Sequence, residues 1–120
     1  MPDSIQSLDD LRERLRRFAA DRDWDQFHSP KNLAMALIAE AAELVEHFQW
    51  LTEQQSASLP SESKEPVADE LADVLIYLVR LADKLDIDLI AAAAAKMDRN
   101  EAKYPATVVK GSARKYTEYR

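Results

Sequence analysis

Two pairs of acidic residues have a spacing that could hold a metal ion. Glu40 and Glu43 lie three residues apart, and Glu70 and Asp73 repeat this spacing 30 residues further along the chain. Residues three apart on a helix are neighbours on its surface, so each pair can present two carboxylates to one point. Plotted at about 100° per residue, each pair borders a stripe of apolar side chains. We therefore expect two neighbouring helices to build one site between them.

Four carboxylates beside apolar surface repel one another and need a cation, and neither motif contains a lysine or arginine. Oxygen ligands favour Mg²⁺, Mn²⁺ or Ca²⁺ over Zn²⁺. We expect Mg²⁺, with Mn²⁺ as an alternative, since bound Mg²⁺ usually shares its coordination shell with substrate phosphates. A single E-x-x-E is most often a solvated helix face, but its repetition without basic partners favours a metal site for phosphoryl chemistry. Glu46 projects farther from the apolar stripe and is interpreted as a surface acid.

Composition indicates an all-α chain. The 120 residues are 47% hydrophobic and 32% charged with a single glycine, which favours one helical core over a sheet. The absence of cysteine excludes disulfides and thiolate metal sites. A net charge of −6 argues against a general nucleic-acid binder, and the sequence lacks both a membrane-length apolar run and a signal-peptide pattern. We expect a cytoplasmic protein without a membrane partner.

The elements that must position the acids are four amphipathic helices, predicted over residues 8–21, 31–51, 65–85 and 89–103. Ser7, Ser29 and Asp88 have the residue type and position of helix N-caps. Residues 52–65 are polar and are predicted to form a solvent-facing loop. Residues 107–120 are expected to form an extended basic tail.

These helices predict a four-helix bundle in a single domain covering residues 1–120, with a helical core at 7–106 and the tail at 107–120. The two acid-bearing helices have apolar arcs wider than one small partner helix covers. We therefore expect a homo-oligomer.

The acid pairs stand within a wider pattern. E-x-x-E, 26 intervening residues and E-x-x-D resemble the signature of the all-α nucleoside triphosphate pyrophosphohydrolases, the MazG-like superfamily. Further segments resemble its dCTP pyrophosphatase branch, at residues 22–33, 48–50, 73–79, 96–100, 104–105 and 112–117.

This resemblance implies hydrolysis of a (deoxy)nucleoside triphosphate, with dCTP or a modified dCTP as the expected substrate. Cleavage between the α and β phosphates gives the monophosphate and pyrophosphate. It also implies that residues matching Glu40, Glu43, Glu70 and Asp73 hold Mg²⁺, that water attacks directly, and that one glutamate is the base, for which we favour Glu43. Members form dimers or tetramers built as dimers of dimers, often with a base pocket completed by a second subunit.

Five further residues are predicted to bind substrate. Trp24 and Trp50 could stack on a base, although both could be core or interface tryptophans. Tyr77 projects between Glu70 and Asp73 and could reach a sugar or phosphate, or simply pack on its neighbours. Lys96 and Asn100 share a helix face, which is often only solvated, but the resemblance favours phosphate or sugar contacts. Weaker phosphate candidates are His28, Lys31, Arg114 and Lys115.

Two other functions compete with hydrolysis. A non-enzymatic helical oligomerisation or regulatory module would use the acids structurally, so chelators and nucleotides would leave its melting temperature unchanged. A di-iron carboxylate bundle would need Glu-x-x-His on two helices, and neither acid pair is followed by a histidine at that spacing. The preferred base, the number of metal ions, the identity of the general base and the choice between dimer and tetramer are left open.

Overall fold

A computed structural model of the protein describes residues 4–113 and 117, and these are helical without any strand. The elements, in chain order, are α1 (Leu8–Asp21), the 3₁₀ helix η1 (Asp25–Phe27), α2 (Pro30–Glu46), α3 (Glu53–Ala57), α4 (Ser61–Lys84), α5 (Leu89–Lys103) and α6 (Ala106–Val109). The predicted all-α class is therefore confirmed, with six α-helices in the described residues instead of four.

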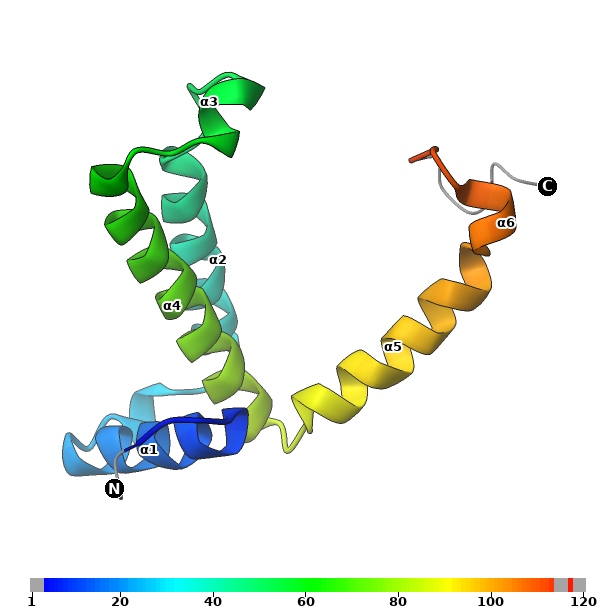
Figure 1. Ribbon diagram of the computed structural model, residues 1–120. Helices are drawn as coiled ribbons and strands as arrows, with labels where there is room; N and C mark the ends of the chain where they lie inside the picture. The colour runs from blue at the N-terminus through cyan, green and yellow to red at the C-terminus, as the bar shows by residue number, and fades with distance from the viewer. Residues whose placement is uncertain (1–3, 114–116, 118–120) are drawn as a thin grey trace. The chain divides into compact units, whose positions relative to one another are not determined.

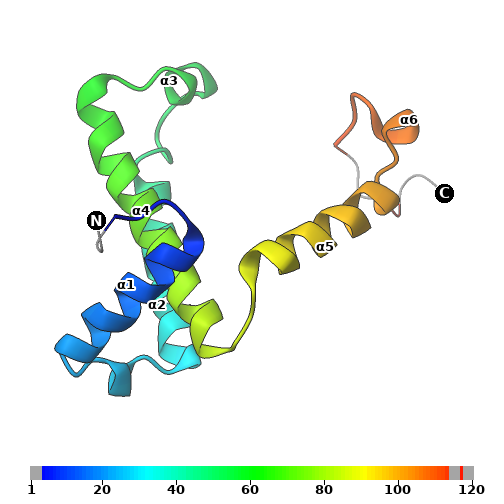
Figure 2. The ribbon, with the colours of Figure 1, turned by 60° about the horizontal axis from the view of Figure 1, so that its bottom comes forward.

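The chain divides into two compact units, residues 1–86 and 87–120. In the first unit α2 and α4 lie side by side and run in opposite directions, and α1 packs against α4 near the start of α2 (Figures 1 and 2). The buried apolar side chains come from all three helices: Leu11, Ala19, Leu33, Val67, Val79 and Ala82. This packing brings the two acid-bearing segments onto adjacent helices.

Side-chain caps explain why several helix starts were predictable. The Ser7 hydroxyl accepts a hydrogen bond from the Asp10 N–H at 3.0 Å, and the Asp88 carboxylate accepts one from the Ala91 N–H at 3.0 Å. Ser29 caps α2 in the same way, with Pro30 at its first position. The predicted helices at 8–21 and 89–103 are confirmed residue for residue.

The predicted end of the second helix was wrong. α2 ends at Glu46, and residues 47–50 form turns. The His47 N–H bonds to the carbonyls of Leu44 and Val45, which tightens the chain out of α geometry. The apolar residues Phe48 and Trp50 continue the helical spacing in sequence, and no glycine marks the stop.

The predicted loop at 52–65 was also wrong. It contains α3, which begins with a capping box between Thr52 and Gln55, and the first turn of α4. Pro66 therefore lies inside α4 instead of at its start. Proline has no backbone N–H, and a helix loses no hydrogen bond from this only in its first turn. The sequence therefore suggested that the helix begins near Pro66, later than it does.

The second unit contains α5 and α6, separated by Tyr104 and Pro105. Because residues 106–109 are helical, the prediction of an extended tail was wrong for this part. The predicted tail residues 114–116 and 118–120, which include Arg114 and Lys115, lie outside the described residues. None of the helices in the described part is long and apolar enough to cross a membrane.

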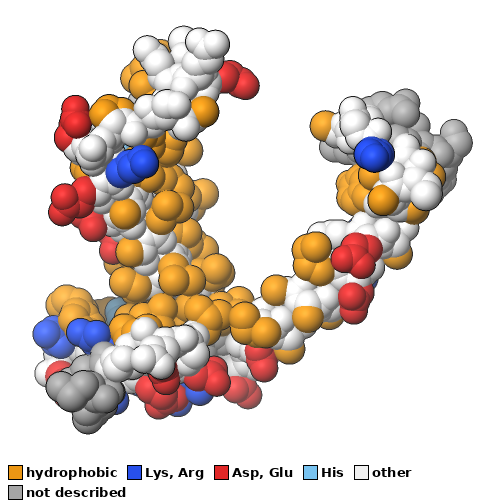
Figure 3. Space-filling model, in the orientation of Figure 1, with side chains coloured by type: hydrophobic (Ala, Val, Ile, Leu, Met, Phe, Trp, Pro, Cys, Tyr) orange, Lys and Arg blue, Asp and Glu red, His pale blue; other side chains and the backbone are white. Residues whose placement is uncertain are grey.

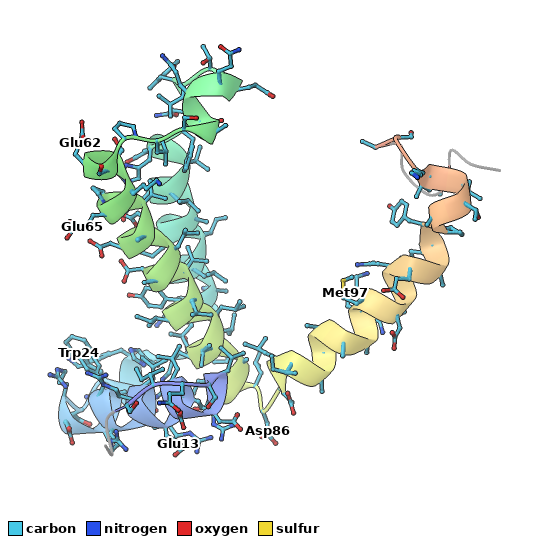
Figure 4. All side chains as sticks on the ribbon, in the orientation of Figure 1. Glu13, Trp24, Glu62, Glu65, Asp86 and Met97 are labelled. Atoms are coloured by element: carbon cyan, nitrogen blue, oxygen red, sulfur yellow. The ribbon has the colours of Figure 1, made fainter. Side chains whose placement is uncertain are left out.

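One surface of the first unit is apolar. Figure 3 shows hydrophobic side chains gathered along α2 and α4. The exposed members are Met35, Ile38, Val45, Leu71, Leu75 and Leu78. The labelled acids Glu62 and Glu65, in contrast, point outward from the first turns of α4 (Figure 4). The two helices thus bury one face against each other and leave a second apolar face uncovered within the first unit.

Candidate active site

Three of the four predicted acids meet between α2 and α4. Glu40 and Glu43 lie one turn apart on α2, and Glu70 approaches them from α4. One carboxylate oxygen from each residue lies within 4.8 Å of the others. The pairing of two packed helices, which the repeated spacing predicted, therefore produces a convergent set of oxygen atoms.

This cluster is short of positive charge. Glu40 Oε2 and Glu70 Oε2 are buried and have no hydrogen-bond partner among the described residues. Burial, followed by the neighbouring carboxyl groups of Glu70, Glu43 and Asp73, raises the pKa of Glu40 to about 7. Burial is also the largest cause that raises the pKa of Glu70. The folded chain therefore favours the neutral forms of these two carboxyl groups. A bound cation would offset the charge of their ionised forms.

The donor set fits a divalent cation. All three donors are carboxylate oxygens, the ligand type that Mg²⁺ and Mn²⁺ prefer. Glu40 and Glu70 each have a buried oxygen without a hydrogen-bond partner in the described structure. Asp73 lies one turn beyond Glu70 and does not join this group of three in the described structure. It lines the adjoining pocket instead. Glu40, Glu43 and Glu70 therefore form an acidic cluster, and the fourth predicted ligand, Asp73, lies next to it on α4.

The adjoining pocket has a volume of about 490 Å³. It lies between α1, α2, α4 and the connector after α1, and its lining residues are Ile5, Leu11, Arg14, Leu15, Phe18, Trp24, His28, Leu33, Asp73, Ile76, Tyr77 and Arg80. Among these are two of the predicted substrate-binding residues, Trp24 and Tyr77. A mostly apolar pocket with a few polar groups is the usual form of a small-molecule site.

Trp24 is held by an aromatic contact. Its ring meets that of Phe18 edge to face, with 5.6 Å between the centroids, and the Arg22 guanidinium lies 3.8 Å from the Phe18 ring centroid. Trp24 remains 45% exposed beside the end of α1 (Figure 4). Its ring is therefore positioned by the protein and still open to a ligand.

Trp50 is not among the residues that line this pocket. It is 86% exposed in the turn beyond α2, so it does not lie on a continuous helix over residues 31–51 as predicted. A helix of 17 residues is about 25 Å long, and Trp24 and Trp50 flank its opposite ends. Within the first unit the two tryptophans do not form the two walls of one base site.

Lys96 and Asn100 both lie on α5, in the second unit, where Lys96 is exposed and Asn100 is half-buried. Their contact with substrate stays a prediction. Lys31 is exposed at the beginning of α2, and His28 is half-buried and lines the pocket.

Arg80 is the site residue that sequence reasoning missed. It is only 5% exposed, yet it lines the pocket and pairs with Asp25 at 2.5 Å, with Asp83 at 3.4 Å and with His28 at 3.2 Å. A signal was present in the sequence, because Arg80 is the one charged residue in the apolar run from Val74 to Ala82. Buried charges are retained where they have specific partners.

The partners of Arg80 are themselves paired. Arg16 holds both oxygens of Asp83, at 2.5 and 2.8 Å, and Lys84 donates to Asp25 at 2.5 Å. The Arg16 guanidinium keeps the pKa of Asp83 below its usual value, and the Lys84 ammonium does the same for Asp25. We call these five residues the ion-pair network; it ties α1 and η1 to the end of α4.

An all-helical chain with an acidic cluster beside a ligand-sized pocket has the arrangement of a site that could hold a divalent cation next to a small molecule. Residues 36–119 match the MazG-like family, and the chain belongs to that family. It is 47% identical to human dCTP pyrophosphatase 1 and 46% identical to the mouse protein of that name, covering 93% of this chain and 67% of each relative. The crystal structure of a pyrophosphatase from Archaeoglobus fulgidus is similar, with a TM-score of 0.78 and 41% identity over 85% of this chain and 95% of that one.

Proposed function

We propose that this protein hydrolyses a (deoxy)nucleoside triphosphate, dCTP or a modified dCTP, to the monophosphate and pyrophosphate. The observation that carries the proposal is the convergence of Glu40, Glu43 and Glu70 beside a 490 Å³ pocket, with two buried oxygens that have no partner among the residues the structure describes. Membership of the MazG-like family and the printed names of the relatives support nucleoside triphosphate pyrophosphohydrolase activity.

The acids would hold Mg²⁺, with Mn²⁺ as the alternative, through Glu40, Glu43, Glu70 and Asp73. Such an ion, when bound, offsets phosphate charge and lowers the pKa of an attacking water. Glu43 is the exposed member of the cluster, which leaves its carboxylate reachable by a water molecule and supports its assignment as the base. The base would take one proton from the water as its oxygen forms a bond to phosphorus and the pyrophosphate oxygen leaves.

The pocket residues would bind the rest of the nucleotide. Trp24 offers an open ring face for stacking on the base, and the Tyr77 hydroxyl can bond to the sugar or a phosphate. Trp50, Lys96 and Asn100 would complete the site, and we propose that a second subunit supplies part of it. The exposed apolar face of α2 and α4 supports assembly of the bundle as a homodimer or a tetramer of two dimers.

We further propose that residues 1–120 act as one functional domain, with the helical core at 7–106 and the basic tail at 107–120. Its setting would be the cytoplasm, with a nucleotide as substrate and without a nucleic-acid or membrane partner. The net charge of −6 supports the exclusion of a general nucleic-acid surface.

A substrate panel tests this function. Pyrophosphate release should be measured with dCTP, 5-methyl-dCTP, dUTP, dTTP, dATP and dGTP, each with Mg²⁺, Mn²⁺ or a chelator. We expect dCTP or its modified form to give the highest kcat/KM and the chelator to abolish turnover. If every triphosphate is left intact under all conditions, and nucleotides also fail to raise the melting temperature, the non-enzymatic helical module replaces this proposal.

A further inference from the structure

Helix α1 makes a small apolar contact with the rest of the first unit. It packs against α4 and η1, and Figures 1 and 2 show it crossing one end of the α2–α4 pair. Its buried residues are Leu11 and Ala19, and an alanine side chain contributes little apolar area. A helix of 14 residues is only marginally stable by itself in water. The position of α1 therefore depends on polar contacts with α4 as well.

Arg16 makes such a contact, and it lies between the two buried residues of α1. Its Nε–H and Nη2–H donate to the two carboxylate oxygens of Asp83 on α4, at 2.8 and 2.5 Å. A bidentate pair of this kind is stronger and more directional than a single hydrogen bond. The Asp83 side chain is only 10% exposed, so solvent screens the pair less than it screens a pair on the open surface. We call the Arg16–Asp83 pair the α1 clamp.

Both members of the α1 clamp are held by further partners. The third guanidinium nitrogen of Arg16 donates to Glu13 of the same helix at 3.0 Å. Asp83 also accepts a bond from Arg80 at 3.4 Å, one turn before it on α4. These contacts restrict the rotation of both side chains, so the clamp fixes the place at which α1 meets α4.

The end of α1 is attached to α4 separately. The Trp24 N–H bonds to the Ala19 carbonyl at 2.9 Å, and Asp25 in η1 pairs with Arg80 of α4. These contacts do not involve Arg16. A chain that lacks the Arg16 guanidinium would therefore keep the connector on α4 and lose its hold on the body of α1.

α1 also forms one side of the pocket. It contributes Leu11, Leu15 and Phe18 to the lining, whereas Arg16 and Asp83 are not among the lining residues. The α1 clamp therefore does not touch a molecule that occupies this pocket. It acts at a distance, by keeping three apolar side chains in place.

We propose that Arg16 is a positioning residue: its pair with Asp83 keeps α1 on α4, and without it α1 detaches while the α2–α4 pair stays folded. Local opening of this kind has its own free energy, below that of global unfolding. The detachment concerns the free protein. Its effect on substrate binding rests on the proposed function, because only the closed form has a complete pocket.

Hydrogen–deuterium exchange of backbone amides tests the detachment in metal-free protein without nucleotide. Arg16→Met removes the guanidinium and keeps an unbranched side chain of similar helix propensity. We expect the α1 amides of this variant to exchange almost as fast as those of an unfolded peptide, while the slowest amides of α2 and α4 change by less than about threefold. An acceleration in α1 no larger than that in α2 and α4 would overturn the proposal.

Glu13→Gln is the matched control, because it removes the partner of Arg16 on the same helix and leaves the pair with Asp83 intact. Glu13 is labelled on α1 in Figure 4. Exchange in α1 should stay within about twofold of the wild type in this variant, since exposed pairs three residues apart contribute little. Arg16→Lys keeps the charge without the two-point contact and should restore part of the protection. If Glu13→Gln exchanged as fast as Arg16→Met, the α1 clamp would have no special role.

The same variants test the effect on binding through the division between KM and kcat. When the closed form is a minor species, KM rises by the reciprocal of its fraction, about fivefold for a closed fraction of about one fifth. We expect this rise for dCTP in Arg16→Met, with kcat changed by less than about twofold, because the bound state is the closed one. A KM in Arg16→Met equal to that in Glu13→Gln would contradict the effect on binding. If the wild type hydrolyses no triphosphate, the proposed function fails, and the exchange experiment still decides whether Arg16 holds α1.

Discussion

The two halves of α4 treat charge in opposite ways. Toward its start, Glu70 faces Glu40 and Glu43 of α2, and two of their oxygens are buried without a partner in the described structure. Ten residues further on, Arg80 is buried and has acidic partners on two elements, Asp25 in η1 and Asp83 in α4. Burying an unpaired ion costs several kcal/mol, so selection for folding alone does not favour the first arrangement. The comparison teaches that unpaired charge marks the place for a ligand, while paired charge serves the fold.

The largest effect should come from removing one carboxylate of the unpaired cluster. Glu43→Gln should lower kcat/KM by about 100-fold or more, since it removes both a ligand and the proposed base. Glu46→Gln on the same helix is the matched control, because Glu46 is exposed and lies outside the cluster. Steady-state pyrophosphate release measures both. Equal activity in the two variants would remove the distinction between the cluster and an ordinary surface acid.

The ion-pair network should instead control stability. Asp83→Asn takes an acceptor from the buried Arg80 and from Arg16, and we expect the free energy of unfolding to fall by about 3 kcal/mol. Urea denaturation measures this loss. Glu62→Gln, whose side chain points outward from the first turn of α4 (Figure 4), is the control and should change stability little. A loss no larger than that of Glu62→Gln would mean that the network is not structural.

Metal should stabilise the wild type and not the cluster variants. Mg²⁺ at 100 times its dissociation constant should raise the free energy of unfolding by about 2.7 kcal/mol. Glu40→Gln should reduce this response and, in the presence of a chelator, melt above the wild type, because it replaces a carboxylate whose charge is unfavourable in the folded state. Thermal melts with and without Mg²⁺ decide the matter. If Glu40→Gln melted lower in chelator and responded fully to Mg²⁺, the cluster would not be a metal site.

The smallest effect is a difference in pH dependence. Because the folded pKa of Glu40 is about 7 and its ordinary value is 4.5, the folded state binds more protons between these values. The stability of metal-free protein should therefore rise as pH falls from about 7 to 4.5, and Glu40→Gln should flatten that slope. Asp83, whose pKa is lowered, contributes stability above its ordinary 3.8 that is lost as pH falls through its folded pKa. Unfolding curves from pH 3 to 8 would separate the contributions of Glu40 and Asp83. A free energy of unfolding that does not change between pH 4.5 and 7 in the wild type would contradict the prediction for Glu40.

Local signals determined how much of the fold was predictable. The boundaries of α1 and α5 followed from residues whose side chains cap the first turn, a short-range interaction that a sequence displays directly. The end of α2 could not be read in this way, because Phe48 and Trp50 keep the helical spacing after the backbone has left it. The capping box at Thr52 is visible in the sequence, but the low apolar content of residues 52–65 indicated a loop instead of a helix.

The site was predictable to the extent that it repeats along the chain. The spacing of Glu40, Glu43 and Glu70 indicated where two helices would converge. The pocket required a third helix: α1 contributes Leu11, Leu15 and Phe18 to its lining, and nothing in their spacing specified which partner they would face. Arg80 depends on an aspartate 55 residues away, a long-range pairing that no local pattern contains.

The α4 side of the pocket sets the distance between the polar groups that line it. Asp73, Tyr77 and Arg80 line one pocket from a single face of the helix, and seven residues correspond to a rise of about 10 Å with almost two complete turns. The separation between Asp73 at one end of this face and Arg80 at the other is therefore set by the geometry of the helix backbone. Inserting one residue between Asp73 and Arg80 would rotate the two side chains by about 100° onto different faces of the helix. Inserting seven residues would keep them on one face but move them about 10 Å farther apart, which would suit a longer ligand.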